Sequence, residues 1–306
     1  MHHSHRLHHF NLAPRNYQAG FGTMSSSAEQ NNWLSDLRCY RAIKNSLAGR
    51  HDHIAKAYQQ QWPNFIIVGS AKSATTTLAT VLGRHPEIQI SRSMEPKFFG
   101  RNYRRGWEWY GQQFSGAKRH RLRGEASTMY TSSYRSYQHT PQLIRHHLGI
   151  IPLIYLVRHP LRRIESHWRH WRGRVNDCPP FHQLLESKAL RQRVVEASLY
   201  HQQLMRYRRW FPAESIHCLS TEELNANPVE SLNIILKFLG QPPDASKLLL
   251  SEKLPVTNSA GSKGRREVAQ PQWTDELKKQ TIEIIQPDSE QFLETLQWPK
   301  NTWRWH

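Results

Sequence analysis

A short apolar run that ends at a glycine, followed by a polar loop and a helical pattern, limits the fold of this chain more than any other feature. The run Phe65–Val68 stops at Gly69, which is typical of a buried strand in a parallel sheet. The loop Ser70–Ala74 follows, and Thr75–Arg84 then carries apolar residues at helical spacing, with threonines able to cap its start. The segment therefore predicts a strand, a tight loop and a helix in direct succession.

The same order of elements recurs further along the chain. Ile151–Val157 is an apolar run, and Pro160 opens a segment with apolar residues along one helical face. Another strand is predicted around Ser215–Leu219, before a helix at Pro228–Leu239. This alternation predicts an α/β, P-loop-like three-layer fold with a central parallel sheet and helices on both faces.

The beginning of the chain differs from the rest. We predict a His-rich, partly disordered N-terminal extension at residues 1–61 and a single domain at residues 62–306. A short helix is expected between Trp33 and Tyr58. The extension opens with the histidines His2, His3, His5, His8 and His9. Nothing near them provides the fixed geometry of a metal site, so no metal is predicted.

The chain is strongly basic. Lysine and arginine number 42 against 24 acidic residues, which gives a formal charge of +18 and a pI of about 10.1. Such a charge favours a polyanionic partner, which can be nucleic acid, an anionic membrane surface, a charged glycan or a phosphorylated cofactor. The net charge alone does not distinguish among these partners.

Two features bear on where the protein works. The apolar runs are far shorter than the roughly 20 residues that cross a bilayer, so no membrane span is expected. Cys39, Cys178 and Cys218 are widely separated, with no spacing typical of a zinc or redox motif. We therefore expect reduced thiols and a cytoplasmic location.

The loop after the first predicted strand has the composition of an anion site. Residues Gly69–Leu78 read GSAKSATTTL. A tight turn into a helix directs backbone N–H groups and the positive end of the helix dipole at one point, to which Lys72 adds a full charge. A helix start that is merely capped is the alternative. The strict pattern of the nucleotide-kinase P-loop, with lysine directly after glycine, is absent.

Gly69–Leu78 resembles the 5′-phosphosulfate loop of the sulfotransferase family, and Tyr155–Trp168, with the sequence YLVRHPLRRIESHW, resembles its 3′-phosphate motif. The resemblance implies 3′-phosphoadenylyl sulfate as the sulfuryl donor. Many members carry a second glycine at the position of Ala74, and alanine should be tolerated there if it keeps a negative φ. The donor-binding residues that the resemblance implies in these motifs are Lys72, Ser73, Ala74, Thr75, Thr76, Arg158 and Ser166.

A third motif lies near the C-terminus. Ser262–Arg265, with the sequence SKGR, resembles the Lys-Gly loop of heparan-sulfate-type sulfotransferases, and the overall motif style is also similar to bacterial members. A solvated basic loop is the alternative interpretation. The resemblance runs from about Asn64 to the C-terminus and implies donor contacts from Ser262, Lys263, Gly264 and Arg265.

The reacting groups are expected between the two phosphate motifs. Met94–Phe99 reads MEPKFF and resembles the family's Glu-Pro-His-Phe-Phe segment, which implies Glu95 as the general base. Lys72 would stabilise the leaving phosphate. Lys97 stands where glycan-modifying members often have histidine, and it can contact an anionic substrate. Glu125, in a segment that resembles a second acidic motif of the family, is a further candidate for substrate binding.

The sequence thus favours a sulfotransferase that acts on a hydroxyl or amine of a carbohydrate or another small hydroxylated acceptor. A basic polyanion- or nucleic-acid-binding protein on a P-loop-like scaffold is an alternative, although no nucleic-acid-binding motif supports it. A nucleotide kinase is another, but it needs an acidic magnesium partner that does not stand out. The acceptor itself cannot be inferred from the sequence.

Overall fold

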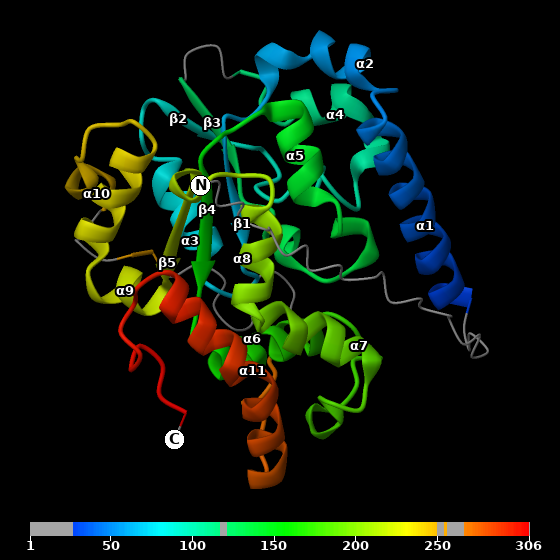
Figure 1. Ribbon diagram of the computed structural model, residues 1–306, viewed down its shortest axis with the longest axis vertical. Coiled ribbons are helices and arrows are strands. Elements are labelled where there is room, and N and C mark those ends of the chain that lie inside the picture. The colour runs from blue at the N-terminus through cyan, green and yellow to red at the C-terminus, as the bar shows by residue number, and fades with distance from the viewer. Residues whose placement is uncertain (1–26, 117–120, 250–253, 256–265, 306) are drawn as a thin grey trace, which may run out of the picture. The chain divides into compact units, whose positions relative to one another are not determined.

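The computed structural model describes residues 27–116, 121–249, 254–255 and 266–305 (Figure 1). Contacts divide the chain into two units, Met1–Ser35 and Asp36–His306, and the sheet belongs to the second. The strands are β1 (Phe65–Gly69), β2 (Ile88–Ile90), β3 (Leu122–Glu125), β4 (Leu153–Val157) and β5 (Ile216–Ser220). The helices are α1 (Ser27–Leu47), α2 (Asp52–Ala57), α3 (Thr75–Leu82), α4 (Gly106–Gln112), α5 (Thr140–Leu148), α6 (Pro160–Arg172), α7 (Lys188–Leu190), α8 (Tyr200–Arg208), α9 (Thr221–Ala226), α10 (Pro228–Phe238) and α11 (Asp275–Thr295).

In the part of the chain that the structure describes, the five strands form one parallel sheet in the order β2-β3-β1-β4-β5. β1 is central, because Ile66 pairs with Glu125 on one side and with Leu153 on the other. The predicted parallel sheet is confirmed, as are the strands predicted at β1, β4 and β5.

The remaining strands, β2 and β3, were not predicted. β2 has only three residues, and β3 reads Leu-Arg-Gly-Glu, so neither gives a recognisable apolar run. Their pairing depends on close packing, since a Cβ added at Gly124 would lie 2.1 Å from the Phe65 ring. Tertiary contacts, rather than local pattern, define this side of the sheet.

Helices cover both faces of the sheet (Figure 1). On one face, Ile67 and Ile154 pack with α3 and α10 in an aliphatic core. On the other, Ile66 and Tyr155 pack with α5, α8 and a large group of aromatic side chains. Successive strand residues therefore point to opposite layers, and the predicted three-layer α/β architecture is confirmed.

The segment before β1 is more structured than a single short helix. The helix expected between Trp33 and Tyr58 is replaced by two helices, α1 and α2. Cys39, Ile43 and Ala55 are buried in the aromatic core of the second unit. The domain boundary at residue 61 stays a prediction, and the histidines between residues 2 and 9 lie outside the described residues.

None of the three cysteines forms a disulfide bond with a described residue, and Cys39 and Cys178 are buried. Among the described residues, no helix combines the length and the apolar character that a membrane crossing requires. The cytoplasmic location stays a prediction from the sequence.

Candidate active site

The sheet has a topological switch point between β1 and β4. The chain leaves β1 through α3 toward β2 on one side, whereas it leaves β4 through α6 toward β5 on the other side. Open α/β sheets bind ligands outside the carboxyl ends of the strands at such a point. The loop Ser70–Ala74 follows β1 and Arg158 follows β4, so two of the predicted donor motifs meet here.

The loop Ser70–Ala74 is tightly folded against β4. The Ser70 N–H donates to the Leu156 carbonyl at 2.5 Å, and the Ser70 and Ser73 hydroxyls are 2.6 Å apart. Ser73 and Thr75 are buried, whereas Lys72 and Thr76 are partly exposed. Ala74 is the N-cap residue of α3 and its side chain makes no cap hydrogen bond, so the predicted threonine cap is wrong. Amide groups at a helix start can bind an anion.

Ala74 does not keep a negative φ, contrary to the condition expected from the sequence. Its φ is +60° and its ψ is 15°, which is the left-handed region, and it stands directly before α3. An alanine in this region costs about 1–2 kcal/mol because Cβ approaches the following carbonyl oxygen. Lys72 also has a positive φ, of 74°. The loop therefore holds a strained turn at Lys72 and Ala74.

Lys72 lies against α6. Its Nζ atom is 3.4 Å from Nδ1 of His170. Ser166 occupies the preceding turn of the same helix and is partly exposed. The predicted leaving-group lysine and the predicted 3′-phosphate helix are thus next to one another.

Arg158 is anchored through its backbone. The Tyr200 hydroxyl donates to the Arg158 carbonyl at 2.7 Å, and the Arg158 N–H points back to the same hydroxyl at 3.4 Å. Among the residues that the structure describes, no carboxylate forms an ion pair with the Arg158 guanidinium. Its charge is therefore available for a phosphate.

Arg163 is an important residue that the sequence reasoning missed. Its side chain is completely buried in α6, and burial lowers the pKa of its guanidinium. Nε donates to Ser198 Oγ at 2.7 Å, Nη1 to the Ala71 carbonyl at 3.2 Å, and Nη2 to the Val194 carbonyl. A buried charge is costly unless hydrogen bonds satisfy it. Here those bonds hold the loop backbone at Ala71 onto α6.

No local pattern could have revealed Arg163. It stands two residues after Leu161 and one before Ile164, so it lies off the helical face that these apolar residues share. Its burial, which only the structure shows, indicates a structural or functional task. The neighbouring His167 is also buried, with Nδ1 3.0 Å from Arg163 Nη1, and burial holds the pKa of His167 well below its usual value.

Glu95 and Lys97 form an ion pair in the segment that follows β2, next to the residues that follow β3. Glu95 Oε2 lies 3.2 Å from Lys97 Nζ, and about a third of each side chain is exposed. The segment is fixed by backbone contacts, because the Ala126 N–H donates to the Met94 carbonyl at 2.8 Å and the Lys97 N–H donates to Ser127 Oγ at 2.8 Å. Since β3 pairs with β1, the predicted base is held beside the strand that carries the donor loop.

Glu125 is fully buried below this segment. Its carboxyl group accepts hydrogen bonds from Tyr110 at 2.6 Å, from Tyr130 at 2.9 Å and from Ser127. Burial raises the pKa of Glu125 to about 7, although these hydroxyl donors oppose the shift. The side chain has no exposed surface, and it is linked to the Met94–Phe99 segment through Ser127, which accepts from the Lys97 N–H, and through Tyr130, which accepts from the Phe99 N–H. Its contact with substrate stays a prediction.

The predicted Lys-Gly loop, Ser262–Arg265, lies outside the described residues. The segment that follows it is held along α6. Arg169 Nε donates to the Val268 carbonyl at 2.9 Å, and Trp273 Nε1 donates to Glu165 Oε1 at 2.7 Å. The chain directly after the loop therefore runs beside the helix that carries Ser166.

A cavity of about 640 Å³ lies beside the first turn of α6, at the carboxyl ends of β4 and β5. None of the predicted site residues lines it. Its charged lining is balanced and does not favour an anion; it consists of Arg162, Lys278 and Arg304 with Glu165, Glu222 and Asp275.

Comparisons with known proteins identify relatives of the described domain. The profile of the family described as a sulfotransferase domain matches residues 63–291. The chain is 28% identical over 200 residues to heparan sulfate glucosamine 3-O-sulfotransferase 5 of Mus musculus, covering 61% of this chain and 56% of that protein. It is 26% identical over 210 residues to the bifunctional heparan sulfate N-deacetylase/N-sulfotransferase of Drosophila melanogaster, covering 59% and 20%. The chain spans about half the length of that 3-O-sulfotransferase and a fifth of the bifunctional protein.

The fold has a counterpart among solved structures. The crystal structure of a sulfotransferase from Alicyclobacillus acidocaldarius matches 78% of this chain and 97% of that chain, with a TM-score of 0.62 and 23% identity. At this identity the match shows a shared fold, in agreement with the predicted P-loop-like architecture.

Proposed function

Because the chain belongs to the sulfotransferase domain family, we propose that it transfers a sulfuryl group from 3′-phosphoadenylyl sulfate to a hydroxyl or amine group of an acceptor. Membership of the family confirms the resemblance drawn from the sequence motifs, and the chain is a sulfotransferase. The donor, the acceptor class and the roles of single residues are the proposal.

The observation that carries the proposal is the meeting of the loop Ser70–Ala74 with Arg158 at neighbouring strand ends. The start of α3, Lys72 and the Arg158 guanidinium, for which the described residues provide no ion-pair partner, lie around this point. Such a set suits a ligand with two separate anionic groups, since amide donors take one and an arginine fork takes the other. A nucleotide with a 5′-phosphosulfate and a 3′-phosphate has this chemistry.

The transfer needs a base and a stabiliser for the leaving group. The bound donor supplies a sulfur atom that is bonded to a phosphate oxygen. Glu95 accepts the proton of the acceptor hydroxyl or amine while that oxygen or nitrogen bonds to sulfur. Lys72 neutralises the negative charge that gathers on the bridging oxygen as its bond to sulfur breaks. The products are the sulfated acceptor and adenosine 3′,5′-bisphosphate, and no metal is required.

Other side chains support these groups. Arg158 and Ser166 bind the 3′-phosphate, and the Ser262–Arg265 loop contacts the same nucleotide in this proposal. Lys97 orients Glu95 and offers a positive charge to an anionic acceptor. In place of direct contact with substrate, Glu125 fixes Ser127, which accepts from the Lys97 backbone.

A carbohydrate is the favoured acceptor class. Two relatives are named for heparan sulfate, and one name specifies O-sulfation while the other specifies N-sulfation. The charge of +18 suits an acidic glycan but equally suits nucleic acid. A cytoplasmic location is retained with this proposal, and it would restrict the acceptors that the enzyme meets.

Donor binding gives the direct test of this function. Adenosine 3′,5′-bisphosphate should raise the melting temperature of the purified protein, with a gain of about 2.7 kcal/mol at a hundredfold excess over Kd. Isotope-labelled donor with a panel of glycans, followed by mass spectrometry, then identifies the acceptor. Stabilisation by ATP alone, with magnesium-dependent turnover, would favour a kinase, and salt-sensitive RNA binding without transfer would favour a nucleic-acid-binding protein.

A further inference from the structure

A cluster of metal-binding side chains lies away from the proposed donor site. Asp52 is the first residue of α2, and His146 and His147 stand in the last turn of α5. α5 leads into β4, and α2 precedes β1, so the cluster belongs to the amino edge of the sheet. The loop Ser70–Ala74, by contrast, lies at the carboxyl edge of the sheet, directly after β1. The cluster is therefore separate from the transfer chemistry.

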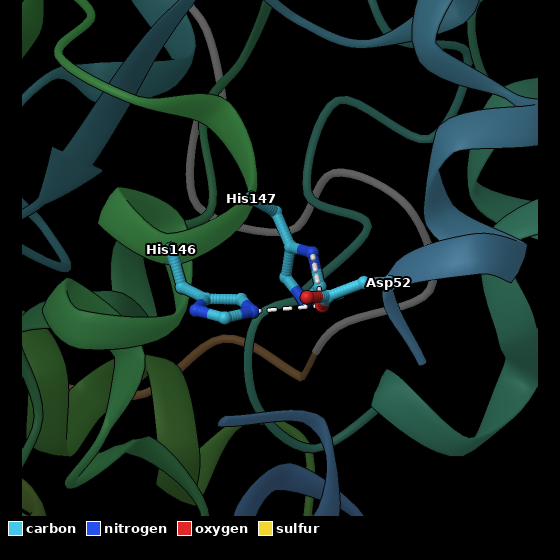
Figure 2. A group of neighbouring side chains, drawn as sticks. All are labelled: Asp52, His146 and His147. Carbon is cyan, nitrogen blue, oxygen red and sulfur yellow. Dashed lines mark hydrogen bonds and ion pairs between the residues drawn. The ribbon is translucent and has the colours of Figure 1, made fainter. Parts of the chain in front are cut away.

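The three side chains converge on one point. Figure 2 shows both imidazole rings facing the Asp52 carboxylate from α5. Asp52 Oδ1 lies 2.8 Å from His146 Nε2 and 4.0 Å from His147 Nδ1, and all three ligand atoms are within 4.8 Å of one another. Tetrahedral zinc, with bonds of about 2.0–2.1 Å, keeps neighbouring ligand atoms roughly 3.3 Å apart. Combined movements of up to about 1.5 Å between a pair of ligand atoms would give this spacing.

The ring of His147 is oriented by an outer hydrogen bond. Its Nε2 atom is 2.7 Å from Ser46 Oγ, which is 2.5 Å from the Tyr103 hydroxyl. The His147 side chain is 3% exposed, so this contact fixes it in the core. Metal-binding histidines commonly use their second nitrogen in this way. The remaining nitrogen, Nδ1, faces the carboxylate at a distance too long for a hydrogen bond.

We propose that Asp52, His146 and His147 bind a divalent transition-metal ion, with zinc as the ion that the imidazole and carboxylate ligands favour. Asp52 and His146 are 40% and 29% exposed, which gives the ion a path from solvent and leaves one position for water. The ion joins the segments that lead into the central strands β1 and β4. Its role is structural, since it ties α2 to α5.

An ordinary ion pair is the competing explanation. Asp52 in the first turn of α2 and a protonated His146 in the last turn of α5 each complement a helix dipole, so the 2.8 Å contact alone needs no metal. The third residue is what distinguishes the explanations, because His147 adds a buried, oriented nitrogen at the same point. Zinc binding must therefore be measured directly.

The test uses the full chain with alanine at His2, His3, His5, His8 and His9, so that any zinc measured is not held by those histidines. The protein is stripped with a chelator, reloaded with zinc chloride, and analysed for bound zinc and for melting temperature. We expect one tightly bound zinc ion per chain. At a hundredfold excess over Kd, zinc should raise the melting temperature by about 5 °C or more.

Asp52→Asn and His146→Ala should weaken zinc affinity about a hundredfold or more, because even outer hydrogen-bond partners of metal sites cost 10- to 100-fold. Asp177→Asn and His182→Ala, both at exposed positions, are the matched controls and should bind zinc as the parent does. The decisive quantity is the rise in melting temperature on addition of zinc. Loss of the Asp52–His146 ion pair lowers the stability of the metal-free protein in any case. The proposal is overturned if the parent binds no stoichiometric zinc, or if Asp52→Asn binds it equally well.

Discussion

Lys97 Nζ lies 3.2 Å from Glu95 Oε2, so the carboxylate proposed as the base is paired with a cation two residues away. Both side chains are about one-third exposed, and exposed pairs of this kind contribute only about 0–1 kcal/mol to stability. The pair therefore matters for the orientation of Glu95 rather than for folding. Lys97 in turn has a φ of +53°, in the left-handed region.

Glu95→Gln should slow sulfuryl transfer by about 10²- to 10⁴-fold, the usual contribution of a positioned base. The substitution keeps the size of the side chain and removes its ability to take a proton. Affinity for adenosine 3′,5′-bisphosphate should stay within a few fold. Single-turnover rates with labelled donor measure the effect, and Glu108→Gln, at an exposed position of α4, should match the wild type. Wild-type turnover of Glu95→Gln would show that another group is the base.

Arg158→Ala should weaken binding of adenosine 3′,5′-bisphosphate by about 10- to 100-fold, and Ser166→Ala by about 3- to 10-fold. An ionic hydrogen bond to phosphate is stronger than a neutral hydroxyl contact. Adenosine 5′-phosphosulfate, which lacks the 3′-phosphate, serves as the control ligand in calorimetric titrations. Its affinity should be unaffected by both substitutions. Equal losses for the two nucleotides would show that the residues support the fold instead.

The sequence predicted the central strands and the donor loop because their signals are local. β1 and β4 are continuous apolar runs, and Pro160 sets the start of α6. The edge strands β2 and β3 could not be predicted, since three-residue pairing depends on neighbours such as Phe65. The buried Arg163 also escaped prediction, because its partners Ala71, Val194 and Ser198 lie far from it in the sequence.

The motifs predicted which residues form the candidate site, and that assignment stays a prediction, whereas the backbone geometry could not be predicted. The motif supplied Lys72 and Glu95, whereas the Glu95–Lys97 pair and the burial of Glu125 depend on how β3 packs. The sign of φ at Ala74 is set by the turn between β1 and α3. A single sequence contains no side-chain pattern that predicts the sign of φ at this position.

Ala74→Gly should stabilise the protein by about 0.5–1 kcal/mol. Relief of the left-handed strain gains about 1–2 kcal/mol, and the greater flexibility of glycine in the unfolded chain costs about 0.5–1 kcal/mol. Urea unfolding followed by circular dichroism measures the difference. Ala79→Gly, within α3 and buried, should destabilise by about 1 kcal/mol or more. If Ala74→Gly were less stable than the wild type, the left-handed conformation of Ala74 would not be a source of strain.

Arg163→Lys should destabilise the protein by about 2–4 kcal/mol and weaken donor-product binding even where the protein is folded. Lysine keeps the charge, but its single ammonium group cannot reach Ser198, Ala71 and Val194 at once, so buried carbonyls lose donors. Arg162→Lys, at the exposed neighbouring position, should change stability by no more than about 0.5 kcal/mol. If folded Arg163→Lys bound the nucleotide as tightly as the wild type, Arg163 would not position the loop Ser70–Ala74 for nucleotide binding.

The buried Glu125 should give stability a characteristic pH dependence. Burial raises the pKa of this carboxyl group from 4.5 to about 7 in the folded protein. Between these values the folded state holds a proton that the unfolded state has lost. The stabilisation is therefore fully present below about pH 4.5 and is lost as the pH rises through about 7, with a total near 3 kcal/mol.

Glu125→Gln should remove this loss of stability at rising pH, because the amide resembles the protonated acid and stays neutral. Free energies of unfolding in urea, measured from about pH 5 to about pH 8, give the comparison. The buried His147 and His167 have lowered pKa values, and their contribution rises with pH, so the raw curve mixes opposite signs. The difference between wild type and Glu125→Gln isolates the carboxyl group, while Glu108→Gln should follow the wild type. Parallel curves for wild type and Glu125→Gln would mean that Glu125 is already ionised throughout this range, held by Tyr110, Tyr130 and Ser127.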